Sequence, residues 1–272
     1  GILSNTITPK LVKKFVPVRK SSSRKGDNGK VLVLGGSYIY HGAPALSSLA
    51  ALRTGADLVY TCVPKINVQS TRAVSPNLIV IPLVDSKLTR GAVNKLLGQI
   101  PNDLDSATIG MGLSIQDPEA LKLLVKSLLA RDVRLSLDAT ALVNYILPLL
   151  SGKNVVVTPH DGEFKRMFGE TPPESKKARI TMVEKFAKEH SVTILLKGPT
   201  DIISDGGKTY LNPTNTPGMT VGGTGDILSG IIAGMLARNR DALESAVISA
   251  YFNGIAGKMT QKKLGHHMTA TD

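Results

Sequence analysis

The 272-residue chain has no tryptophan, one cysteine and only 4% aromatic residues. Because Cys62 stands alone, the chain cannot form an internal disulfide, which is typical of a reducing compartment, and we expect a cytoplasmic protein. No stretch approaches the roughly 18 uncharged apolar residues of a membrane span. Residues 1–17 also lack the pattern of a secretory signal, so the sequence predicts no membrane association.

Several ligand-binding motifs are also missing. The chain contains no G-x-x-x-x-G-K-[ST] sequence, and no G-x-G-x-x-G follows its first predicted strand. These absences exclude a P-loop and the Rossmann dinucleotide fingerprint. The five histidines show no metal-binding spacing such as H-E-x-x-H, so we predict no metal-ligating residues from the sequence.

Positive charge is concentrated at the N-terminal end. The net charge is +12, and residues 1–30 account for +7 of it. This segment lacks the interleaved aromatic residues of a single-strand binder, so we interpret it as a solvated basic leader or linker and expect no nucleic-acid partner. With 42% hydrophobic residues in the chain, residues 31–272 can bury the core of one large domain.

From residue 31 onward, short apolar runs alternate with stretches of helical periodicity. Strands are predicted over residues 31–34, 58–63, 78–81, 107–109, 133–137, 155–158 and 192–196, then a hairpin of 201–203 and 209–211. Helices are predicted over residues 43–56, 118–130, 225–238 and 241–262. Because the strands are almost entirely apolar, both sheet faces should be covered, which indicates an α/β fold with a mainly parallel sheet.

Ligands of such sheets bind at the carboxyl ends of the strands. Four predicted strands end in distinctive polar or glycine-rich groups, namely Gly35–Ser37, Gly110–Gly112, Thr158–Glu163 and Lys197–Asp201. We expect these groups and the stretch 218–226 to line one crevice.

The stretch 212–226 carries the strongest chemical signal. Directly before Asp226 and a predicted helix it places four glycines: Gly218, Gly222, Gly223 and Gly225. Glycines let backbone N–H groups converge, and a helix start adds free N–H groups, so the loop is suited to hold an anion. A carboxylate beside that anion is electrostatically costly, which favours a chemical role for Asp226, most simply taking a proton from a hydroxyl. The alternative is a glycine-rich turn in which Asp226 only caps the helix.

Two further residues are candidates for ligand contacts. His160 follows a buried strand and precedes a predicted helix, where it could donate a hydrogen bond to a ligand or serve only as a turn residue. Lys197, at the end of an apolar strand, is suited to bind phosphate. A charge that merely reaches solvent at a strand end is the alternative.

Taken in order, the motifs resemble the NAD(P)H-hydrate dehydratases of the ribokinase-like superfamily, which repair hydrated nicotinamide cofactors. The similarity covers nearly the whole chain after the leader and rests on Lys25–Lys30, Gly35–Ser37 with Tyr40, Gly42–Pro44, Thr158–Phe164, Leu196–Gly198 with Asp201, Pro217–Leu228 and Ala270–Asp272. The loop 222–226 alone would also fit vitamin and sugar kinases. The blocks 42–44 and 158–164 favour the dehydratases.

The resemblance implies a ribokinase-like fold and a set of site residues. At the hydrated dinucleotide it implies Ala43, Gly112, His160 and Asp226, of which Asp226 is catalytic. At the adenine nucleotide it implies Lys197, Gly198, Pro199, Thr200, Asp201, Gly222, Gly223, Thr224 and Gly225. The chain departs from the family at Ser114, where a third glycine is more common, and this departure weakens the assignment of Gly112.

The implied reaction is the ADP- or ATP-dependent dehydration of the S epimer of hydrated NADH or NADPH. Asp226 would take the proton of the C6 hydroxyl as this attacks the terminal phosphoryl group, with glycine amides and Mg²⁺ at the phosphate oxygens. We expect ADP as the donor, a homotetramer, and an NAD(P)HX epimerase as a fused or separate partner. Gly1 in place of Met and the early end at Asp272 suggest a processed or excised fragment.

Two other functions stay open. A kinase of the same fold would phosphorylate a vitamin or sugar alcohol and release a stable phosphorylated product. A nucleotide-binding sensor would bind without turnover, and the intact Asp226 and glycine loop argue against it. The sequence does not decide between hydrated NADH and hydrated NADPH.

Overall fold

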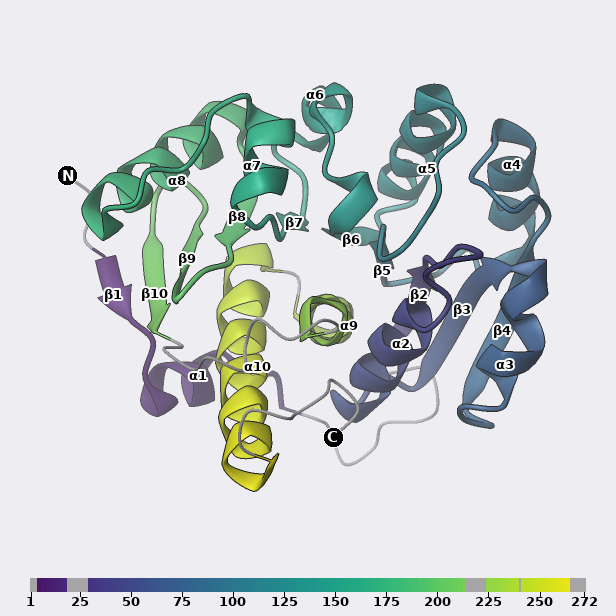
Figure 1. The fold of residues 1–272 in the computed structure, drawn as a ribbon, viewed down its shortest axis with the longest axis horizontal. Coiled ribbons are helices and arrows are strands. Elements are labelled where there is room, and N and C mark those ends of the chain that lie inside the picture. The colour runs from purple at the N-terminus through teal and green to yellow at the C-terminus, as the bar shows by residue number, and fades with distance from the viewer. Residues whose placement is uncertain (1–3, 19–28, 214–223, 240, 265–272) are drawn as a thin grey trace.

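The computed structural model describes residues 4–18, 29–213, 224–239 and 241–264. Within these residues one sheet of ten strands runs in the order β1-β10-β9-β8-β7-β6-β5-β2-β3-β4 (Figure 1). Neighbouring strands are parallel except in the β8–β9 and β9–β10 pairs, so β9 alone among these strands runs against the others. The predicted α/β fold with a mainly parallel sheet is confirmed.

Every strand expected from the sequence is present, with bounds that differ by one or two residues. The strands are β1 (Ser4–Thr6), β2 (Lys30–Leu34), β3 (Leu58–Pro64), β4 (Leu78–Leu83), β5 (Ser106–Ile109), β6 (Arg134–Leu137), β7 (Val155–Val157), β8 (Thr193–Leu196), β9 (Thr200–Ser204) and β10 (Thr209–Pro213). The predicted hairpin is the antiparallel β9–β10 pair.

Helices cover both faces of the sheet (Figure 1). One face carries α1 (Pro9–Phe15), α2 (Ala43–Arg53), α9 (Thr224–Arg238) and α10 (Ala242–Leu264), and the other α4 (Arg90–Gln99), α5 (Pro118–Ala130), α6 (Leu147–Leu150), α7 (Asp161–Phe168) and α8 (Lys176–His190), with α3 (Val68–Arg72) beside β4. Strand β2 is apolar throughout because both of its faces are buried. Leu32 and Leu34 pack in one core, and Val31 and Val33 pack in the other. No helix among the described residues has the length and apolar character needed to cross a bilayer.

Of the basic leader predicted over residues 1–30, residues 4–15 pack on the sheet, whereas residues 1–3 and 19–28 lie outside the described residues. Strand β1 pairs in parallel with β10, and the side chains of Ile7 and Val12 are buried in the core against α10. The local sequence supports α1, since Thr8 accepts a hydrogen bond from Leu11 N as its N-cap and Pro9 follows in the first turn. Residues 4–15 are therefore part of the folded structure.

Helix α9 is held unusually close to α2. A side chain on Gly230 would overlap the backbone oxygen of Ser47, and one on Gly234 would overlap Thr54. Glycine at these positions lets the two helices meet through their backbones. The Ser47 hydroxyl also donates a 2.7 Å hydrogen bond to the backbone oxygen of Asp226, which fixes the start of α9 against α2.

Candidate functional site

The site lies at the carboxyl ends of the central parallel strands. Gly110 follows β5, Asp138 follows β6, Thr158 follows β7 and Lys197 follows β8, and these four strands are adjacent in the sheet. Asp226 is the third residue of α9, which packs over β5 and β6. The crevice expected from the sequence is thus formed by neighbouring strand ends, as ligand sites of open α/β sheets are.

Asp138 is the centre of this arrangement, and the sequence analysis did not single it out. Its side chain is buried, and its Oδ1 atom accepts hydrogen bonds from Thr158 Oγ1 at 3.0 Å and from Lys197 Nζ at 3.3 Å. Its Oδ2 atom accepts one from Ser229 Oγ at 3.0 Å, one turn beyond Asp226 in α9. One carboxylate therefore joins the ends of β6, β7 and β8 to the first turns of α9.

Lys197 lies between two carboxylates. Its Nζ atom is 3.3 Å from Asp138 Oδ1 and 3.9 Å from Glu163 Oε1. Burial lowers the pKa of the Lys197 ammonium, but the two carboxylates outweigh this effect and raise the pKa above its usual value. Lys197 is therefore a permanent cation in the crevice, which supports the prediction of a phosphate ligand over that of a solvated strand end.

Asp226 has the electrostatic environment of a general base. Burial raises its pKa to about 7, the nearby carboxylate of Asp138 adds to the shift, and Lys197 opposes it. A base whose pKa is close to the working pH exchanges protons efficiently. Asp226 lies in the first turn of α9, next to the carboxylate of Asp138 and the ammonium of Lys197 that shift its pKa.

Gly225 is the residue that lets α9 reach the crevice. A Cβ atom at this position would lie 3.3 Å from Lys197 Nζ and 3.9 Å from Asp138 Oδ2. Thr224 begins the helix. The predicted contacts at Gly222 and Gly223 fall outside the described residues.

His160 has a structural role at the start of α7, and its contact with a ligand stays a prediction. Its Nδ1 atom accepts a hydrogen bond from Glu163 N at 3.2 Å, and Glu163 Oε1 accepts one from His160 N at 3.1 Å, which together form a capping box at the start of α7. With Nδ1 as an acceptor, the neutral ring carries its proton on Nε2. The side chain is 60% exposed, and its Nε2 atom lies 3.5 Å from Glu163 Oε1.

The predicted nucleotide residues form a turn beside a cavity of about 540 Å³. Its lining includes His160, Arg179, Lys197, Gly198, Pro199 and Thr200. Asp201 belongs to the turn but is buried, and its carboxylate accepts hydrogen bonds from Gly198 N at 3.2 Å and Asn212 Nδ2 at 3.4 Å. Burial raises the pKa of Asp201 to about 6. Asp201 therefore shapes the turn, while residues 197–200 face the cavity.

Ala43 and Gly112 lie at the opposite end of the crevice. Ala43 is the first residue of α2, and Gly112 adopts a φ of +67°, a conformation that favours glycine. Gly110 adopts a φ of +127° directly against the backbone oxygen of Asp138. Ser114 is not among the described residues with positive φ, so its departure from glycine requires no change in the backbone.

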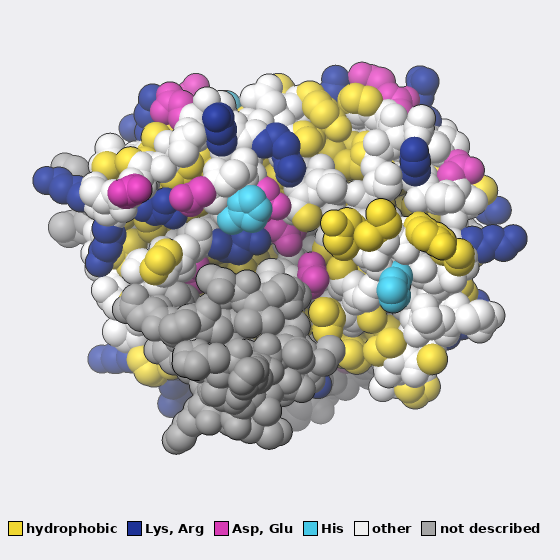
Figure 2. Space-filling model, in the orientation of Figure 1, with side chains coloured by type: hydrophobic (Ala, Val, Ile, Leu, Met, Phe, Trp, Pro, Cys, Tyr) yellow, Lys and Arg dark blue, Asp and Glu magenta, His cyan; other side chains and the backbone are white. Residues whose placement is uncertain are grey.

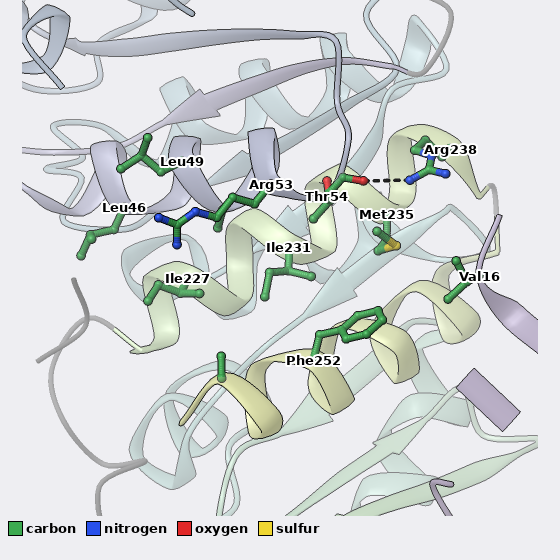
Figure 3. A pocket seen from close by; sticks show the side chains of 12 residues that line it. Val16, Leu46, Leu49, Arg53, Thr54, Ile227, Ile231, Met235, Arg238 and Phe252 are labelled. Atoms are coloured by element: carbon green, nitrogen blue, oxygen red, sulfur yellow. Dashed lines mark hydrogen bonds between the residues drawn. The ribbon is translucent and has the colours of Figure 1, made fainter. Parts of the chain in front are cut away.

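Charged groups of both signs and a histidine gather near the middle of the face in Figure 2. A second cavity, of about 490 Å³, is instead an apolar groove between α2, α9 and α10 (Figure 3). Leu46 and Leu49 of α2, Ile227 and Ile231 of α9, and Phe252 of α10 border it, and Arg238 donates a hydrogen bond to Thr54 O at one end. The described residues that line the groove include no carboxylate or histidine.

Comparison with known proteins agrees with this geometry. The family model for NAD(P)H-hydrate dehydratase matches residues 31–272. The chain belongs to this family. It is 70% identical over 267 residues, 98% of this chain and 93% of the relative, to the ADP-dependent (S)-NAD(P)H-hydrate dehydratase of Nitrosopumilus maritimus. The resemblance inferred from the sequence is confirmed.

Two further relatives extend the comparison. The bifunctional NAD(P)H-hydrate repair enzyme of Pyrobaculum aerophilum is 41% identical over 256 residues, which are 93% of this chain but 50% of that protein. The crystal structure of the ADP/ATP-dependent NAD(P)H-hydrate dehydratase from Bacillus subtilis, co-crystallised with ATP and Mg²⁺, has a TM-score of 0.84 at 28% identity and covers 98% of this chain and 94% of that one. The ribokinase-like fold is thereby confirmed.

Proposed function

We propose that this protein is an ADP-dependent dehydratase that returns the S epimer of hydrated NADH or NADPH to NADH or NADPH. One observation carries the proposal above all others: Asp226, with a pKa of about 7, lies at a helix start beside the ion pair of the half-buried Lys197 and the buried Asp138. This combination supplies a base and a phosphate cradle at one point. The names of the family and of its close relatives support the same reaction.

Hydroxide on C6 is a poor leaving group, so the reaction requires this oxygen to be phosphorylated before the C6–O bond breaks. Ionised Asp226 takes the proton of the C6 hydroxyl while the oxygen of that hydroxyl attacks the terminal phosphoryl group of the nucleotide. Lys197 and the free backbone N–H groups at the start of α9 hold that phosphoryl group, where negative charge redistributes during transfer. The C6–O bond then breaks with release of phosphate as the lone pair of the ring nitrogen forms an iminium ion. Loss of a proton from C5 to water or to the released phosphate then gives the neutral dihydronicotinamide.

Mg²⁺ would be held mainly by the phosphate oxygens of the nucleotide, because Asp138 and Glu163 already face the cationic Lys197 Nζ at 3.3 Å and 3.9 Å. No group of three or more His, Cys, Asp or Glu side chains among the described residues could hold a metal ion alone. When bound, Mg²⁺ neutralises phosphate oxygens.

The cavity beside residues 197–200 is the proposed site of the adenine nucleotide. Lys197 and the turn held by Asp201 would contact its phosphate end, and we expect ADP to be the preferred donor. The relative from Nitrosopumilus maritimus is named ADP-dependent, which supports ADP. The structural relative from Bacillus subtilis is named ADP/ATP-dependent, so activity with ADP should be compared with activity with ATP.

Three broader expectations accompany this function. We infer an NAD(P)HX epimerase as a fused or separate partner, which the bifunctional relatives support. We expect a homotetramer, which sedimentation velocity would test. A cytoplasmic location agrees with a single, buried cysteine whose thiol pKa is raised by burial to about 12.

A kinase of the same fold is the second candidate, because an activated base next to a phosphate cradle would also serve phosphorylation of a stable alcohol. A sensor that binds nucleotide without turnover is the third.

The deciding experiment mixes the purified protein with hydrated NADH, Mg²⁺ and either ADP or ATP, and follows the return of reduced-nicotinamide absorbance. Recovery that depends on ADP supports the proposal. A stable phosphorylated product would indicate a kinase. Nucleotide binding without any turnover would indicate a sensor.

A further inference from the structure

A short loop between β2 and α2 exposes three large apolar side chains in succession. Tyr38 is 76% exposed, Ile39 is 74% exposed and Tyr40 is 65% exposed. The chain has six tyrosines in 272 residues, so two on one exposed loop is a notable concentration. Figure 2 shows hydrophobic side chains gathered on the same face as the central histidine and charged groups. Exposed apolar patches of this kind mark binding surfaces.

The loop is fixed by hydrogen bonds at its base. Ser37 N donates to Tyr40 O at 3.3 Å, and Tyr40 N donates to Ser37 Oγ at 3.2 Å. The buried Asn67 donates from Nδ2 to Ser37 O at 3.2 Å, and Gly36 N donates to Met111 O at 2.8 Å. The backbone is therefore anchored while the aromatic rings face outward, as a preorganised binding surface requires.

The position of the loop relates it to the crevice. A Cβ atom on Gly112 would lie 2.8 Å from Tyr40 Cβ, so Tyr40 packs on the loop that follows β5. In the sheet, β5 and β2 lie on one side of Asp138, and β8 with Lys197 lies on the other. The aromatic loop is thus on the opposite side of the crevice from the proposed nucleotide cavity.

We propose that Tyr38 and Tyr40 form a stacking platform for the adenine base of the dinucleotide substrate. This inference rests on the proposed function, which brings the hydrated ring to Asp226 and leaves the other end of the dinucleotide to extend away from it. The hydrated ring is tetrahedral at C6 and no longer flat, whereas adenine is flat and fully conjugated. Flat bases stack on exposed tyrosines with little dependence on hydrogen bonding.

The test compares the wild type with the double variant Tyr38→Ala/Tyr40→Ala. Loss of base stacking is expected to raise KM for hydrated NADH roughly 5- to 100-fold, with kcat and KM for ADP nearly unchanged. Tyr38→Phe/Tyr40→Phe, which keeps both rings, is expected to restore the wild-type KM. Ile79→Ala, an exposed apolar residue on β4, is the control for general loss of apolar surface.

A truncated substrate identifies which end of the dinucleotide uses the platform. Hydrated reduced nicotinamide mononucleotide lacks adenine, so the wild type and the double alanine variant should handle it equally. A higher KM of the double alanine variant than of the wild type on this truncated substrate would overturn the assignment to adenine. Unchanged KM for hydrated NADH would overturn the platform itself while leaving the dehydratase intact.

Two further readouts separate this inference from the proposed function and from self-association. Calorimetric binding of NADH is independent of turnover, and the double alanine variant should weaken it even if no dehydration occurs. A fall in molar mass of that variant in sedimentation would overturn the platform, because the loop would then be a subunit contact.

Discussion

Lys197 Nζ lies 3.3 Å from Asp138 Oδ1, and this ion pair connects the ends of two strands that are 59 residues apart in the chain. The pair holds a cation beside Gly225, in the first turn of α9, where backbone N–H groups have no partner within the helix. Two independent sources of positive potential therefore meet at the position proposed for the transferred phosphoryl group.

Replacing Lys197 by methionine should affect both activity and stability. The variant keeps the apolar stem but leaves the buried carboxylate of Asp138 without its cation, which should lower the free energy of unfolding by on the order of 1–3 kcal/mol. Turnover should fall by roughly 10² or more, since a phosphate ligand is lost. Lys126→Met, at an exposed position of α5, is the matched control. Urea unfolding and the absorbance assay measure the two effects, and a fully active variant would exclude Lys197 from the reaction.

Asp226→Asn should be inactive yet more stable than the wild type. Removing a general base typically costs about 10²–10⁴ in rate. The native carboxyl has a pKa of about 7, above its usual 3.8, so it holds its proton more tightly when folded. Its contribution to stability is therefore present at low pH and is lost as pH rises toward 7. The asparagine variant avoids this loss.

The difference in unfolding free energy between Asp226→Asn and the wild type should therefore grow from pH 4 to pH 7 and then level off, reaching on the order of 4 kcal/mol. Thermal unfolding across this range measures it. Equal stability of the two proteins at every pH would mean that Asp226 is well solvated, and normal turnover would rule out its role as base.

The activity of the wild type should depend on the ionisation of Asp226, and it should rise with pH where the stability contribution of this residue falls. Only ionised Asp226 can take a proton, so kcat/KM should fall about tenfold per pH unit once pH drops below the pKa near 7. Steady-state assays from pH 5 to 9, with Mg²⁺ and ADP held saturating, locate this limb. An acidic limb centred near pH 4 would show that the reacting carboxylate is an ordinary, solvated one.

The sequence was sufficient for the parts of the fold and site that depend on local patterns. Apolar runs located the strands, and a glycine-rich loop before an apolar helix located Asp226. Asp138 was missed because its importance comes from the sheet order, in which β6 lies beside β5 and β7, and from α9 packing above. Its only sequence signal is its position directly after a buried strand, the same signal that identified Lys197.

The N-terminal segment was misjudged for a related reason. Its lysines and arginines dominate the composition, while two apolar side chains, Ile7 and Val12, determine that β1 and α1 pack on the sheet. Pairing of β1 with β10 joins residues about 200 positions apart, and no local pattern reports such a contact. Within this region, the Thr8-Pro9 helix start is the feature that a local sequence pattern indicates.

Asp201→Ala should separate nucleotide binding from dinucleotide binding. Asp201 holds the turn of residues 198–200 through Gly198 N, and Asn212 holds Asp201 in place. Loss of this support should raise KM for ADP by roughly tenfold through misplacement of the turn, with KM for hydrated NADH little changed. Asp205→Ala, on the exposed β9–β10 connection, is the control. Equal increases in both KM values would indicate general disruption.

Gly110→Ala tests how closely the strand-end loops must approach each other. Gly110 has a φ of +127°, which disfavours any residue with a Cβ atom, and that atom would collide with the backbone oxygen of Asp138. The substitution should lower the free energy of unfolding by about 3 kcal/mol and displace Asp138, so turnover should fall as well. Gly98→Ala, in α4 with open space around it, should instead be neutral or stabilise by up to about 1 kcal/mol. A Gly110→Ala protein as stable and active as Gly98→Ala would mean that the loops after β5 and β6 can separate without cost. Asp138 would then be positioned by its hydrogen bonds from Thr158, Lys197 and Ser229.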